Sequence, residues 1–166
     1  MSQLIGHQLT DDLYQRLLGR DLERDAEKVI LLSTIDESGW PHPAMLSYFE
    51  VIASDPCNVR LATYKNSSST NNMRRNGRAT LSIIDERAVY YVKGTVEEIS
   101  REMHCAPHNS KLNLRVDQVL ADQTNEEFEP GAYVAGGVSY RNPLRMQQMQ
   151  TAREVLSELI TENTIA

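Results

Sequence analysis

A succession of short β-branched runs separated by turn sequences most constrains what this chain can fold into. Residues 29–35 form one run, the Asp36–Gly39 stretch has turn chemistry, and further runs cover residues 40–52, 59–63, 79–84, 88–99 and 112–121. Turn signals recurring about every eight to twelve residues are typical of sandwiches and barrels. The pattern predicts a mostly β protein with six strands in a closed or nearly closed barrel, and Gly94 predicts a bulge or bend in the fifth strand.

Helical patterns flank the predicted strands. Thr10 can cap a first helix at about residues 9–19, and Gly77 can end a short helix that runs through Asn76. Residues 143–160 predict a C-terminal helix, whose apolar stripe comprises Leu144, Met149, Ala152, Val155, Leu156 and Leu159. The chain has no internal repeat or low-complexity linker, so we expect a single domain over residues 1–166 with one helix near each end.

Charge and composition exclude several protein classes. The formal net charge of −6 argues against nonspecific nucleic-acid binding, which needs a dense cationic face. The first ten residues are too polar for a signal peptide, and no stretch approaches the roughly 18 apolar residues of a membrane span. The two cysteines, Cys57 and Cys105, form no CxxC pair or disulfide framework. We therefore expect a cytoplasmic protein that binds neither nucleic acid nor membrane.

The segment 61–70 combines the end of a strand, a hydroxyl-rich loop containing Lys65, and the start of a helix. Free backbone N–H groups at a helix N-terminus, hydroxyl donors and a cation are the ingredients of a phosphate site. Serine and threonine are also ordinary helix caps and turn formers. From these residues alone, both a phosphate site and a simple cap stay open.

The order of these features resembles the pyridoxamine 5′-phosphate oxidase-like FMN-binding split-barrel family. The resemblance rests on the Asp36-x-x-Gly39-x-Pro41 turn, followed by strands, the Ser-rich loop and the Asn76-Gly77-Arg78 helix end, and it covers about residues 29–99. It implies a six-stranded split barrel that forms a homodimer, with FMN in a cleft between the subunits and a small-molecule substrate beside it.

The resemblance also implies cofactor-binding residues. The second strand would run along the isoalloxazine through Ala44, Met45, Leu46, Ser47 and Tyr48. The phosphate would be held by Thr63, Lys65, Ser67, Ser68 and Ser69, with Arg74 or Arg75 able to reach the same anion.

The chain departs from this family at several positions. Many relatives carry a basic residue where this chain has Ser68 and Ser69, and the vitamin B6 oxidases have basic residues at Ala44 and Phe49. A charge-assisted contact to phosphate contributes about 1.5–3 kcal/mol, or one to two powers of ten in affinity. We therefore expect weak FMN binding, or a site that has drifted to another ligand, and we predict no vitamin B6 oxidase activity.

Two functions remain open at this stage. One is an FMN-dependent oxidoreductase, in which the cofactor performs the chemistry; no catalytic residue can be named from the sequence. The other is a non-catalytic flavin- or haem-binding protein with a degenerate cofactor site. Haem is a minor alternative because His104, Cys105 and His108 lie close together, although a single short cluster predicts no structural metal site.

Overall fold

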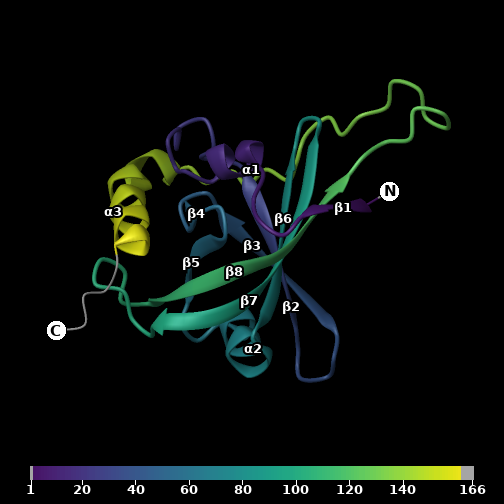
Figure 1. Ribbon diagram of the computed structural model, residues 1–166. Coiled ribbons are helices and arrows are strands. Elements are labelled where there is room, and N and C mark those ends of the chain that lie inside the picture. The colour runs from purple at the N-terminus through teal and green to yellow at the C-terminus, as the bar shows by residue number, and fades with distance from the viewer. Residues whose placement is uncertain (1, 162–166) are drawn as a thin grey trace.

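The computed structural model describes residues 2–161, and its central feature is one curled antiparallel sheet (Figure 1). The strands are β1 (Ser2–Gly6), β2 (Val29–Ile35), β3 (Pro41–Ser47), β4 (Val51–Asp55), β5 (Asn58–Tyr64), β6 (Arg78–Asp85), β7 (Ala88–Ser100) and β8 (Asn109–Asp122). They lie in the order β3-β2-β6-β7-β8-β5-β4, and β1 pairs with β8. Strand β3 is therefore at one end of the series.

The helices surround this sheet. They are α1 (Asp11–Arg16), α2 (Ser68–Asn76), the 3-10 helix η1 (Arg145–Gln148) and α3 (Met149–Ile160). Figure 1 shows α1 at the top, α2 at the bottom and α3 along the left side. Among residues 2–161, no helix is long and apolar enough to cross a membrane.

The predicted mostly β architecture is confirmed, but the prediction of six strands is corrected to eight. The run 40–52 divides into β3 and β4 because a tight turn joins Ser47 to Glu50. The Glu50 N–H donates to Ser47 O (3.0 Å), and the Ser47 N–H donates to Glu50 Oε2 (2.7 Å). Strand β1 was not predicted because its side chains are largely exposed, which leaves no alternating burial pattern to read.

The main apolar core joins side chains of the curled sheet to the region of α1. Leu13 of α1 and Leu17, which follows the helix as its C-cap, are fully buried in the same cluster as Ile30, Leu61 and Leu114 from the strands. Thr10 caps α1 by accepting the Leu13 N–H, as the sequence predicts. The N-terminal helix is thus held by tertiary burial, which a helix of six residues requires.

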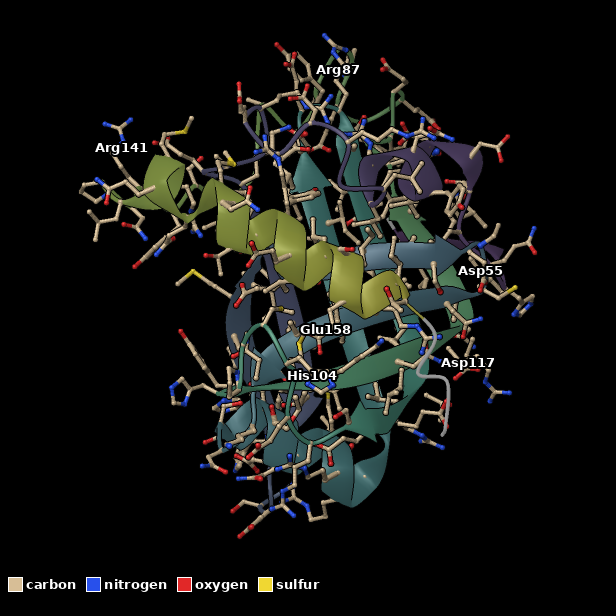
Figure 2. All side chains as sticks on the ribbon, turned by 90° about the vertical axis from the view of Figure 1, so that its left-hand side faces the viewer. Asp55, Arg87, His104, Asp117, Arg141 and Glu158 are labelled. Atoms are coloured by element: carbon tan, nitrogen blue, oxygen red, sulfur yellow. The ribbon has the colours of Figure 1, made fainter. Side chains whose placement is uncertain are left out.

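A second apolar cluster lies beneath α3. It contains the five predicted stripe residues from Met149 to Leu159, whereas Leu144 lies before the helix and is exposed. Buried Lys111 of β8 donates to Glu158 O and Thr161 O (both 2.7 Å), which satisfies carbonyls at the end of α3. The Glu158 carboxylate of α3 accepts from the His104 N–H (2.7 Å), and Figure 2 labels these two residues next to each other near the C-terminal end of α3. Polar contacts therefore fix where α3 lies.

Gly94 occupies the closest approach of β7 to β8. The register shifts between Lys93 and Gly94, which confirms the predicted bulge. A Cβ atom at Gly94 would lie 2.3 Å from Arg115 O and 2.5 Å from a Leu114 methyl group. Only glycine allows the two backbones to approach this closely.

We predict that Gly94→Ala lowers the free energy of unfolding by about 2–3 kcal/mol, because the added methyl group overpacks the β7–β8 contact. Urea denaturation measures the change. Gly136→Ala is the matched control, since nothing lies within 4 Å of its Cβ position. Equal stability of the two variants would contradict the packing argument.

Candidate functional site

A network of hydroxyl groups joins β5 to α2. The Ser67 Oγ caps α2 by accepting the Thr70 N–H (3.2 Å). The Thr70 hydroxyl lies 2.8 Å from Tyr64 O, 2.7 Å from the Thr63 hydroxyl and 3.0 Å from the Ser67 hydroxyl. This network fixes the polypeptide between the strand end and the first turn of the helix.

The direction of these hydrogen bonds decides which donors remain available. A carbonyl oxygen only accepts, so the single Thr70 hydroxyl proton goes to Tyr64 O. The Thr63 and Ser67 hydroxyls must then donate to Thr70 Oγ1. Neither retains a proton for an anion in this arrangement, so their predicted contact with phosphate stays a prediction that requires the network to open.

The first two amides of α2 remain available. Ser68 and Ser69 begin the helix, so their N–H groups have no partner within it. Among residues 2–161, no other group accepts from these two amides. The first turn of α2 contains no acidic residue, so no carboxylate of this turn repels an anion there. The Ser68 side chain is exposed and adds a hydroxyl donor.

The cations near this helix are already paired. Lys65 Nζ contacts the Glu102 carboxylate. Arg74 forms an ion pair with Glu98 and donates to Lys65 O (2.6 Å) and Ser110 Oγ (3.1 Å). The hydrogen bond from Arg74 lowers the pKa of Glu98, as expected for a carboxylate held in its charged form.

Arg75 lies on the side of α2 that faces the β2–β3 hairpin. Its Nη2 donates to Ile35 O (2.8 Å) and Asn72 Oδ1 (3.0 Å), and its Nη1 lies 3.4 Å from Glu37. The side chain of Asn72 also donates to Thr34 Oγ1 (3.0 Å). These contacts fix α2 against the hairpin.

Strand β3 supplies the second part of the site. Among the described residues it pairs only with β2, so alternate backbone N–H and C=O groups point away from the sheet. Met45 is 56% exposed, while Leu46 and Ser47 are buried. Ala44 and Tyr48 pack with the core, and burial raises the pKa of Tyr48 to about 12.

A cavity of about 640 Å³ extends from β3 to Tyr64 at the end of β5, and none of the residues predicted to hold the phosphate is among those that line it. Met45, Leu46 and Ser47 of the predicted flavin strand line one wall. Tyr64 and Asn109, which pair across β5 and β8, line the edge nearest α2. The structure therefore brings these three predicted strand residues to one cavity, close to the loop that precedes α2.

The opposite wall of the cavity comes from the C-terminal segment. Arg145 stands over two aromatic rings, with its guanidinium carbon 4.9 Å from the centre of Phe49 and 6.0 Å from that of Tyr140. Glu50 also lines the cavity. Burial raises the pKa of Glu50 above its ordinary value, against the opposing effects of the Ser47 hydrogen bonds and of Arg145. The cavity thus contains one cation, Arg145, and one carboxyl group, Glu50, whose pKa is raised by burial.

The His104, Cys105 and His108 cluster lies at the β7–β8 loop, against α3. The Glu158 carboxylate accepts the Cys105 N–H (2.9 Å), and burial, then Glu158, raises the pKa of the Cys105 thiol to about 12. No group of three or more His, Cys, Asp or Glu residues in the described chain is arranged to hold a metal ion. The haem alternative gains no support from this arrangement.

Comparison with known proteins gives matches over much of the chain. Residues 21–128 match the profile of a family described as pyridoxamine 5′-phosphate oxidase. The uncharacterized protein YclD of Bacillus subtilis (strain 168) is 34% identical over 99 residues, which are 60% of this chain. The match spans 58% of that relative's length.

Solved structures share the fold at low sequence identity. A Lactobacillus delbrueckii protein classed as a pyridoxamine 5′-phosphate oxidase has a TM-score of 0.57 at 18% identity, covering 72% of this chain and 98% of its own. HupZ of Group A Streptococcus has a TM-score of 0.56 at 13% identity, with coverages of 70% and 96%. An FMN-binding protein of Syntrophomonas wolfei has a TM-score of 0.51 at 13% identity, with coverages of 69% and 92%. The predicted split-barrel fold is confirmed.

Sequence reasoning did not find the cavity wall formed by Glu50, Tyr140 and Arg145. These residues come from a strand turn and from a C-terminal segment distant in sequence, and no motif links them. The only local signal was Phe49, which stands where the vitamin B6 oxidases have a basic residue. Its ring lies beneath the Arg145 guanidinium.

We predict that Glu50→Gln becomes increasingly stable relative to the wild type as the pH rises from 4.5 to neutrality. The folded protein raises the pKa of Glu50, so the stability from its protonated form is present below the ordinary value of 4.5. That stability is lost as the pH rises through the native pKa. Urea denaturation across this range measures the difference, with the exposed Glu127→Gln as control. A pH-independent difference would contradict the assignment.

Proposed function

The chain belongs to the pyridoxamine 5′-phosphate oxidase family, and we propose that it binds FMN in a cleft between two copies of itself. The observation that carries this proposal is the pair of free amides at Ser68 and Ser69, which begin a helix that contacts β3, the strand with the open edge. Amides at a helix N-terminus suit a phosphate group, and an unpaired strand edge suits the polar rim of a planar ring. The donor set therefore fits the two ends of FMN.

In this proposal, the phosphate is held mainly by neutral donors. The available donors lie in the first turn of α2: they are the amides of Ser68 and Ser69 and the exposed Ser68 hydroxyl. The nearby cations Lys65 and Arg74 already form ion pairs with carboxylates. The helix dipole adds a partial positive charge but no full cation. Weak FMN binding follows, as the sequence predicts.

The chain's own groups along β3 orient the ring. Backbone N–H and C=O groups on its open edge provide hydrogen bonds, and the exposed Met45 provides apolar contact. The fold shared with the FMN-binding protein of Syntrophomonas wolfei supports this placement. When bound, FMN supplies hydride or electron transfer, and we propose that the protein is an oxidoreductase acting on a small molecule.

Exposed apolar side chains support the proposed homodimer. They gather on the β2–β3 hairpin and at the end of β5, where Ile35, Trp40, Met45 and Tyr64 are 43%, 70%, 56% and 69% exposed. An apolar surface of this kind is typical of a protein interface. A second copy placed there would enclose the open edge of β3 and complete the cleft.

We also propose a cytoplasmic location for the protein. Cys57 and Cys105 are free thiols, and Cys57 is exposed. Exposed free thiols are usual in reducing compartments and uncommon in secreted proteins.

We predict that FMN binds with a stoichiometry of one per chain and that Ser68→Arg tightens binding by about tenfold to a hundredfold. The arginine would supply the charge-assisted phosphate contact that this chain lacks. Conversely, Ser68→Pro should weaken binding by a similar factor, because it removes the amide donor at a helix position that accepts proline. Ser67 already has an extended backbone (φ −70°, ψ 156°), as a residue before proline requires. Quenching of FMN fluorescence measures each dissociation constant.

Two control variants separate the amide from other effects. Ser68→Ala keeps the amide and removes the hydroxyl, while Asp11→Pro makes the same backbone change at the first residue of α1. Unaltered FMN affinity in both Ser68→Pro and Ser68→Arg would refute the phosphate site. Anaerobic addition of NADH or NADPH then distinguishes an enzyme from a carrier, since only an enzyme supplied with its electron donor bleaches the flavin spectrum.

A further inference from the structure

Arg145 is the most unusual polar group of the cavity. Its Nε atom is buried and has no hydrogen-bond partner among residues 2–161. Among residues 2–161 its guanidinium forms no ion pair within 4.0 Å, although its charge acts on the Glu50 carboxyl group of the same cavity. An arginine that served only to stabilise the fold would be expected to satisfy its buried donor, since an unpaired buried group costs free energy.

The surroundings of Arg145 determine what it can bind. The rings of Phe49 and Tyr140 approach its guanidinium at distances suited to cation–π contacts. These ring contacts supply no hydrogen-bond acceptor atom, so the guanidinium N–H groups are left for a ligand. These N–H groups match the two oxygens of a carboxylate.

Glu50 provides a second recognition group in the same cavity. Its Oε2 atom accepts from the Ser47 N–H (2.7 Å) and the Ser47 hydroxyl (2.9 Å). No described residue donates to Oε1, and this atom is not among the fully buried unsatisfied atoms of residues 2–161. Oε1 is thus available to a hydroxyl or N–H group of a ligand.

The cavity has the size and lining of a small-molecule site. Its volume of about 640 Å³ lies within the range of roughly 300–1,000 Å³ for ligand pockets. Aromatic and apolar walls with a few convergent polar groups are also typical of such sites. Arg145 lies outside residues 21–128, the range that matches the family profile.

From these contacts we propose that the C-terminal wall of the cavity binds a monocyclic aromatic carboxylate that carries a ring hydroxyl or N–H group. The carboxylate contacts the guanidinium N–H groups of Arg145, the ring packs against the apolar lining of the cavity, and the ring substituent donates to Glu50 Oε1. Arg145 and Glu50 are not among the donors proposed for the flavin, although the opposite wall of the cavity is the strand β3 that is proposed to hold the flavin ring.

Isothermal titration calorimetry with 4-hydroxybenzoate tests this proposal on the whole protein freed of FMN. We expect one binding site per chain and a loss of affinity of about tenfold to a hundredfold in Arg145→Gln, from removal of a charge-assisted contact. Arg141→Gln is the matched control, because Arg141 is exposed and its guanidinium contacts Glu27. The uncharged 4-hydroxybenzamide should bind much more weakly, and benzoate, which lacks the hydroxyl, should bind more weakly too.

Each outcome bears directly on the site. Absence of heat with 4-hydroxybenzoate, or equal affinity in Arg145→Gln and the wild type, would overturn the proposal. A second titration at saturating FMN should give the same stoichiometry. Stoichiometric displacement of FMN would overturn it as well, since the wall would then belong to the flavin cleft. Failure of FMN to bind would refute only the proposed flavin function.

Discussion

The hydroxyl of Thr70 connects β5 to α2 and determines which hydrogen-bond donors of the site remain available to a ligand. It donates to Tyr64 O and accepts from Thr63 and Ser67, so one side chain fixes the strand end, the loop and the helix cap. Because these three hydroxyls satisfy one another, the cap consumes donors that an anion would otherwise use. What remains for a phosphate is the backbone of the first helical turn, held at a fixed position relative to β3.

Ion pairing likewise makes the nearby cations less available to an anionic ligand. Lys65 and Arg74 are matched by Glu102 and Glu98, so drawing either one to a ligand means breaking an existing ion pair. Those pairs are at least partly exposed, and their individual contribution to stability is small. They nevertheless lower the positive potential available to a phosphate, which is why the proposed FMN site is expected to bind its cofactor weakly.

The local features of this fold were predictable, because each depends on neighbouring residues. The Asp36–Gly39 turn and the Gly77 cap, with φ of 65°, follow from glycine chemistry at those positions. The division of the second strand at Ser47 was not predictable, because it depends on the Glu50 side chain folding back. The site was less predictable still. The ion pairs of Lys65 and Arg74, and the meeting of Phe49 with Arg145, join residues distant in sequence that only the curled sheet brings together.

The central claim is that the backbone of the first turn of α2 holds the cofactor phosphate. An NMR titration of the 15N-labelled protein with FMN tests this claim most directly, because it observes the amides themselves. The account predicts that the Ser68 and Ser69 amide protons undergo the largest downfield shifts, as expected for new hydrogen bonds to an anion. Large shifts elsewhere, with these two amides unmoved at saturation, would contradict it.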